Sequence, residues 1–386
     1  MSSGVIKAAF KIIALRGRKN KSRNDEIHST SDKISSTYTV TLLLIFNFFV
    51  TKSQYVGDPI ACWAPAYFAR SWKKYADNYC WVKGTYPLPF DEDIPQDELY
   101  REDKTLRYYQ WVPLYLFAMC VFFYLPSCLW SWVNSQSGVA LSPLIKAAKE
   151  YQSTADDKEL EAICFCFEKF VNNQLARKHW ILQILCVLSN RARGNFMITC
   201  YLITKVLYLV SSIGQFFLVS YMLGFNLSSY SLKALYDMSN GNDLAESKFF
   251  PRVTMCNFKV RRLGTINDVN LQCVLPINLF NEKIFIFIWI WIIFAIVLQA
   301  FSFIRWLFLA LSFIDRKRYV HNLLEGVKNK DNLKDFCEYI HKDGALVLKM
   351  INSNTNSLVT SDIAKLLYKR KYEEINSNSN NQEAIV

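Results

Sequence analysis

The chain has 386 residues, a length that suits two or three soluble domains, but 52% of them are hydrophobic and 15% aromatic, and they gather in four long blocks. Each block is long enough to cross a bilayer as a helix, which a buried helix of a soluble protein rarely is. The sequence therefore predicts an all-α membrane protein with four transmembrane helices, at residues 38–56, 111–133, 196–223 and 284–309.

The net charge of +12 is unevenly distributed along the chain. Lysine and arginine gather in residues 1–37, 134–195 and 310–386, whereas residues 57–110 and 224–283 carry fewer. Basic loops stay on the cytoplasmic side of a membrane. We therefore expect both termini and the middle loop to be cytoplasmic and the other two loops to be extracellular. Topology accounts for the basic charge, which argues against a nucleic-acid partner.

In the amino-terminal arm, residues 1–37, Val5, Ala9 and Ile12 recur at helical spacing, which predicts a short amphipathic helix. From the spacing alone, this helix is equally well read as an anchor on the membrane surface or as a helix folded into a pore mouth. No cleavable signal precedes the first span, so the span itself is the expected targeting anchor.

The first span carries a polar face near its end, formed by Asn47, Thr51 and Gln54. Polar groups are costly in lipid, so this face should meet protein or water. Two interpretations remain open: hydrogen bonding to another helix, or lining of a pore.

The second and third spans carry polar or helix-breaking residues that call for helix partners. Pro126 frees a backbone carbonyl inside the second span, which is tolerated only if a neighbour satisfies that carbonyl. Thr204, Ser211 and Gln215 form a polar row on the third span, for which helix packing is favoured over pore lining.

The cysteines indicate two disulfides. Four of the eleven cysteines lie in the expected extracellular loops, two in each loop: Cys62, Cys80, Cys256 and Cys273. The others lie in spans or in cytoplasmic segments, where thiols stay reduced. An even number in the oxidising compartment predicts two disulfides, and the sequence alone leaves three pairings open.

The extracellular loops hold three further features. The first loop has an acidic run at residues 91–103, which is either a solvated surface or a vestibule that concentrates cations. In the second loop, residues 269–276 have strand-like content, which predicts a small β element. Asn226, followed by Leu227 and Ser228, is a glycosylation sequon close to the membrane edge.

Motifs for catalysis, cofactors and metals are missing from the sequence. The four histidines are scattered, and no metalloprotease, serine-hydrolase, Walker or dinucleotide fingerprint occurs. No span carries an arginine series or a pair of carboxylates. These observations disfavour an enzyme, a voltage sensor and a proton-coupled transporter, and we expect no cofactor and no metal. The middle loop and the tail look helical in places.

The start of the second span resembles the signature of the innexins, the invertebrate gap-junction proteins related to pannexins. The matching residues are Tyr108, Tyr109, Gln110, Trp111, Val112 and Pro113. Residues 55–60, 62–63, 80–81, 250–256 and 272–278 also resemble innexin loop blocks, so the resemblance covers most of residues 38–309.

The resemblance implies a subunit of a large-pore channel in the plasma membrane. Innexin subunits form a ring around a pore, an octamer of one or several subunit types. Two such hemichannels from adjacent cells dock through their outer loops and pass ions and small molecules. The family pairs its loop cysteines in nested order, which implies Cys62–Cys273 and Cys80–Cys256. Its amino-terminal helix lines the pore entrance, which favours the pore-mouth interpretation of Val5, Ala9 and Ile12.

The sequence departs from the family pattern before the first span. Residues 16–23 are more basic than expected, and Asp32, Lys33 and Ile34 stand where Asp-Arg-Leu is common. Two other functions fit a four-span protein: an undocked hemichannel that releases small solutes across one membrane, and a poreless adhesion or scaffold protein.

Overall fold

The computed structural model describes residues 28–89, 91–136, 141–155, 157–172, 195–222, 250–325, 327 and 332–383. The expected helix with Val5, Ala9 and Ile12, and the sequon at Asn226, lie outside these residues. The chain divides into two compact units. We call residues 38–123 and 210–296 the disulfide unit, and residues 1–37, 124–209 and 297–386 the tail unit.

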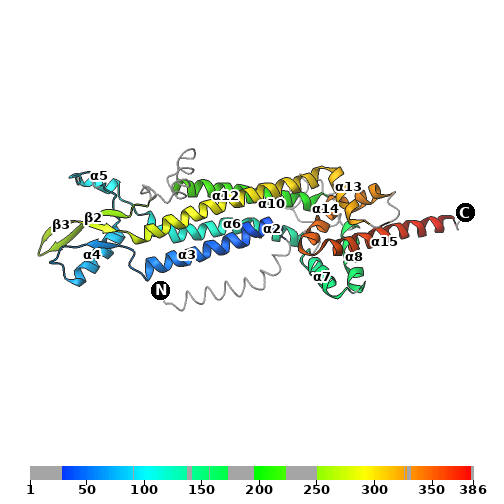
Figure 1. Ribbon diagram of the computed structural model, residues 1–386, viewed down its shortest axis with the longest axis horizontal. Coiled ribbons are helices and arrows are strands. Elements are labelled where there is room, and N and C mark those ends of the chain that lie inside the picture. Colours follow the sequence, from blue (N-terminus) through cyan, green and yellow to red (C-terminus); the bar gives the residue numbers. More distant parts are fainter. Residues whose placement is uncertain are drawn as a thin grey trace. The chain divides into compact units, whose positions relative to one another are not determined.

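Four helices are long and apolar enough to cross a membrane, which confirms the prediction of four spans (Figure 1). The first span is continuous through three segments, α2 (Thr30–Lys33), a π-turn (Ile34–Tyr38) and α3 (Thr39–Tyr55). A 3₁₀ turn (Tyr108–Trp111) leads into the second span. The second, third and fourth spans are α6 (Val112–Gln136), α10 (Phe196–Met222) and α12 (Pro276–Leu311).

Two of these helices begin eight residues earlier than their apolar blocks. The first begins at Thr30 and the fourth at Pro276. Their early turns are polar, so hydropathy does not detect them, but their polar side chains are buried against protein. In the disulfide unit, Asn278 and Glu282 are buried; Asn278 Nδ2 donates to the Pro251 carbonyl at 2.9 Å, and Glu282 pairs with Arg252 at 3.2 Å.

The disulfide unit contains a three-stranded antiparallel sheet in the order β1-β3-β2. Its strands are β1 (Ala61–Trp63), β2 (Val253–Arg262) and β3 (Thr265–Val274). Helix α4 (Arg70–Lys83) contacts β1 and β2, and the short α5 (Glu98–Asp103) follows it in the chain (Figure 1). The β element is larger than the expected strand at residues 269–276, because that segment belongs to β3, which pairs with both β1 and β2.

The tail unit buries one apolar core shared by loop, tail and span residues. The helices that contribute are α7 (Leu141–Thr154), α8 (Asp157–Asn172), α13 (Phe313–Leu323), α14 (Leu333–Asn354) and α15 (Ser357–Glu383). Trp130, Tyr201 and Trp306, from three different spans, meet in this core, with ring centroids 4.8 and 4.7 Å apart for the pairs that include Tyr201. The described parts of the middle loop and the tail contain helices, in agreement with the prediction.

Pro126 has the neighbour that its position requires. A proline at this position leaves the carbonyl of Phe122, four residues earlier, without its helical donor. The hydroxyl of Ser211 on α10 donates to that carbonyl at 3.0 Å. In lipid the unsatisfied carbonyl would be costly, so this hydrogen bond fixes α6 against α10. Ser211 therefore serves helix packing, as predicted.

We expect Ser211→Ala to destabilise the purified oligomer by roughly 1 kcal/mol, because the Phe122 carbonyl loses its donor. Pro126→Ala restores an N–H that satisfies this carbonyl within α6, so Ser211→Ala should cost little in that background. The measurement is the melting temperature of the oligomer on size-exclusion chromatography after heating. Thr204→Ala is the matched control, since Thr204 donates only to Cys200 of its own helix. Equal losses in both backgrounds would contradict the assignment.

Candidate functional site

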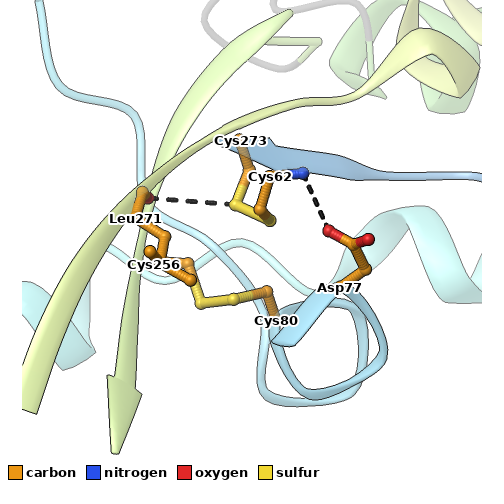
Figure 2. Close-up of a disulfide and its surroundings, with 6 residues drawn as sticks. All are labelled: Cys62, Asp77, Cys80, Cys256, Leu271 and Cys273. Carbon is orange, nitrogen blue, oxygen red and sulfur yellow. Dashed lines mark hydrogen bonds between the residues drawn. A yellow bond between two sulfur atoms is a disulfide. The ribbon is translucent and has the colours of Figure 1, made fainter. Parts of the chain in front are cut away.

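Two disulfides hold the sheet and helix α4 together (Figure 2). Cys62 of β1 is bonded to Cys273, the residue opposite it in the pairing of β1 with β3. Cys80 of α4 is bonded to Cys256 of β2. This is the nested pairing that the resemblance implies. The bonds span 211 and 176 residues, and closing loops this long restricts the unfolded chain by roughly 5 kcal/mol each in the chain-entropy account.

The surroundings of the disulfides are apolar and ordered by one carboxylate. Phe258 is buried beside them, and the rings of Tyr75 and Tyr79 meet it edge-on at 5.9 and 5.2 Å. The Asp77 carboxylate accepts a hydrogen bond from the Cys62 backbone N–H at 2.8 Å, which joins α4 to β1 (Figure 2). Burial raises the pKa of Asp77, although this hydrogen bond opposes the shift.

The disulfide sulfurs do not form a metal centre. The sulfurs of Cys62, Cys80 and Cys273 lie within 4.8 Å of one another, as metal ligands do. Each is in a disulfide, so none is the thiolate that metals bind. Among the described residues, no other such group of histidine, cysteine and carboxylate side chains occurs.

The signature residues, 108–113, form a collar between the spans and the disulfide-bonded sheet with α4. Tyr109 is fully buried, and its ring lies 4.6 Å from that of Trp81 on α4. The carbonyl of Trp81 accepts a hydrogen bond from Gln110 Nε2 at 2.6 Å. The Tyr108 ring meets Phe250 of the second loop edge-on at 5.7 Å. The signature therefore joins both loops to the start of α6.

A glycine allows α4 to end close to the segment that precedes this collar. Gly84 ends α4 at a φ of 94°, in the left-handed region. A Cβ there would lie 2.8 Å from the backbone oxygen of Leu106. Gly84 is therefore required where α4 turns toward the chain that leads to α6.

The polar face of the first span points to the same collar. Asn47 Nδ2 donates to the Pro113 carbonyl at 3.0 Å, and Thr51 donates to Asn47 Oδ1 at 3.0 Å. Gln54 is buried and donates to the Tyr109 carbonyl at 2.6 Å. The sequence left two interpretations of this polar face open, helix packing and pore lining. These hydrogen bonds support helix packing. Asn47 and Thr51 remain half-exposed.

The acidic run of the first loop lies on the surface of the disulfide unit. Asp91, Glu92, Asp93 and Asp97 are exposed. The run ends in α5, where Arg101 donates to Asn257 Oδ1 of β2 at 2.9 Å. The carboxylates are therefore available to solvent and to passing ions.

A buried ion pair in the tail unit was missed by the sequence analysis. Lys205 of α10 lies 2.7 Å from Asp32 of α2, and both side chains are completely buried. Tyr201 donates to Asp32 at 2.7 Å, and Lys205 donates to Ser302 of α12 at 2.7 Å. A signal was present, because a lysine inside an apolar span needs a partner. The partner was hidden because Asp32 precedes the first apolar block.

Comparisons with known proteins agree with this architecture. The family model described as Innexin matches residues 28–371. Innexin unc-9 of Caenorhabditis elegans is 32% identical over 348 residues, which cover 87% of this chain and 90% of the relative. Innexin-16 of the same species is 32% identical over 352 residues, with 90% of each chain covered. Innexin-19 of Caenorhabditis briggsae is 30% identical over 383 residues, which cover 89% of this chain and 86% of the relative.

The four spans, the two inter-loop disulfides, the collar signature and these matches lead to one conclusion. The chain belongs to the innexin family and is a multi-pass membrane protein of the gap-junction channel type.

Proposed function

We propose that copies of this chain, alone or with other innexin subunits, form an octameric ring that docks to a ring in the adjacent cell and passes ions and small molecules. The observation that carries this proposal is the disulfide-bonded sheet with α4, a rigid domain built from both loops. Membership of the innexin family supports the proposal of an oligomeric channel. The octameric count rests on the resemblance.

The disulfides support the proposed topology. Disulfides persist in an oxidising compartment, so the loops with the four bonded cysteines belong outside the cell. A membrane-spanning helix flanks each of these loops on both sides. Both termini and the middle loop then lie in the cytoplasm. The basic charge of those segments supports the same orientation.

The hairpin of β2 and β3 supplies a candidate docking surface. Its turn exposes Leu263 completely, and Ile266 is 63% exposed. Trp63 of β1 is 81% exposed. Neighbouring apolar side chains exposed at the turn of a hairpin favour a protein contact there. We assign this surface to contact with the opposing hemichannel.

The first span is the proposed pore lining, together with the amino-terminal helix of Val5, Ala9 and Ile12. One face of α3 is exposed in the protomer and carries Thr41, Ile45, Phe48, Lys52 and Tyr55. Asn47 and Thr51 lie at the margin of this face and remain pore candidates. Gln54 is buried against Tyr109, which favours a packing role. The exposed acidic run would draw cations toward the mouth.

Paired cells that both express the chain should show junctional current. Single cells that express it should take up a small dye when hemichannels open. Leu263→Asp should reduce the junctional current while dye uptake persists. Aspartate tolerates the positive φ of 48° at this position, so the hairpin keeps its turn while the apolar contact is lost. Aspartate also avoids the Asn-x-Thr glycosylation sequon that asparagine would form with Thr265. The control is Lys317→Asn, at an exposed side chain of α13 in the tail unit, which should leave the junctional current unchanged.

No junctional current from a wild-type chain that reaches the cell surface, with dye uptake intact, would assign the chain to hemichannel release instead. The absence of both junctional current and dye uptake would favour a poreless adhesion protein.

Cys62→Ser should abolish junctional coupling, because β1 loses its covalent link to β3. The same result is expected for Cys80→Ala, Cys256→Ser and Cys273→Ser. Alanine is used at position 80 because serine there would complete a glycosylation sequon with Asn78. Cys166→Ser, at an exposed free cysteine of α8, should leave coupling unchanged. The measurement is junctional conductance at matched surface expression. Coupling retained in Cys62→Ser would show that the sheet keeps its register without the bond.

A further inference from the structure

Two adjoining cavities in the tail unit share two basic side chains. The first, about 260 Å³, is lined by Arg305, Ser302, Lys349 and the first residues of α2. The second, about 400 Å³, is lined by Arg305, Lys349 and residues of α13. Arg305 of α12 and Lys349 of α14 therefore form a cationic boundary between them.

The two cations lack close acidic partners. Among the described residues, no carboxylate lies within ion-pair distance of either side chain. Lys349 Nζ lies 4.8 Å from the centroid of the Trp306 ring, and the Arg305 guanidinium 5.9 Å from that of Phe301. Asp315 lines the second cavity, but it is already 3.7 Å from Arg318.

The charge on Lys349 is under-compensated. Burial and the positive charge of Arg305 lower its pKa to about 8, and Asp315 offsets this only in part. An anion bound between Lys349 and Arg305 would relieve this repulsion and favour the charged lysine.

Hydroxyl groups complete the lining of the first cavity. Ser302 accepts a hydrogen bond from Lys205 at 2.7 Å, which leaves its own proton to donate. Ser353 lies on the α14 side. Basic groups together with hydroxyl donors suit a phosphate, whose oxygens accept several charge-assisted hydrogen bonds.

An apolar surface adjoins these donors on the same helix. Phe301, Ile304 and Phe308 are 61%, 49% and 61% exposed, and Arg305 lies among them near the carboxyl end of a membrane-spanning helix. Such side chains suit contact with acyl chains, whereas a basic group near a helix end suits lipid headgroups. The source of the phosphate is therefore the membrane.

We propose that these cavities bind the phosphate group of an anionic phospholipid, with Arg305 and Lys349 as its ligands, Ser302 as a hydroxyl donor, and the acyl chains against Phe301, Ile304 and Phe308. The proposed topology puts this lipid in the cytoplasmic leaflet. The bound phosphate contacts Ser302, which contacts Lys205, so it stabilises the network at the start of the first span.

The test uses the full-length oligomer, purified in neutral detergent. The probes are dioctanoyl phosphatidic acid, dioctanoyl phosphatidylcholine and glycerol 3-phosphate, and the readouts are the dissociation constant and the rise in melting temperature on binding. Phosphatidic acid should bind saturably and raise the melting temperature. Phosphatidylcholine should not raise it, and glycerol 3-phosphate should bind more weakly because it lacks acyl chains.

Arg305→Gln and Lys349→Gln should each weaken phosphatidic acid binding by about tenfold, the loss expected for one charge-assisted contact. Lys349→Arg should retain binding. Lys317→Gln removes an exposed cation outside both cavities and should change nothing. These readouts need no conduction, so they stand apart from the proposed channel function.

Two outcomes would overturn the proposal. Equal affinity for glycerol 3-phosphate would make this a site for soluble phosphates, and unchanged binding in the double variant Arg305→Gln, Lys349→Gln would place the lipid elsewhere.

Discussion

The buried ion pair of Asp32 and Lys205 is the constraint on which the tail unit depends. Both side chains are fully buried at a separation of 2.7 Å. A charge removed from water is tolerated only when its partners are complete. Here they are complete: the three N–H groups of Lys205 are shared among Asp32 and the hydroxyls of Ser29, Ser31 and Ser302, and Asp32 also accepts from Tyr201. Three spans must therefore meet in one register where the first span begins.

The same end of the first span is held by a second set of contacts. Gln299 of α12 donates to the Ser31 carbonyl and to the Ser35 hydroxyl, each at 2.8 Å. The disulfide unit has a comparable constraint in its two covalent bonds and the buried Tyr109. Each unit is thus built around a rigid element, which suits a passive channel whose subunits must keep a pore open without chemistry.

The sequence predicts what depends on composition and misses what depends on partners. Four spans follow from apolar length, and two disulfides follow from four cysteines in an oxidising compartment. The early turns of α2 and α12 were missed because their polar side chains are buried against other segments. Strand β2 was missed because its tight turn is Leu263-Gly264, with positive φ at both residues, instead of the Asn-Gly that usually marks such a turn.

Some expectations from single residues were correct in kind but incomplete. Pro126 required a neighbouring donor, but only the fold identifies it as Ser211. The polar face of Asn47, Thr51 and Gln54 required protein or water, and the fold provides hydrogen bonds to the collar. A single helix periodicity cannot distinguish these outcomes, because both put the same residues on the same face.

The most direct test of this account is a double-mutant cycle on Asp32 and Lys205. The measurement is the heat-induced loss of the purified oligomer for Asp32→Leu, Lys205→Met and the double variant. Each single change leaves one buried charge unpaired and should cost roughly 3–5 kcal/mol, whereas the double variant, which buries no charge, should recover most of that loss. A double variant whose loss equals the sum of the two single losses would contradict the claim that this ion pair holds the start of the first span.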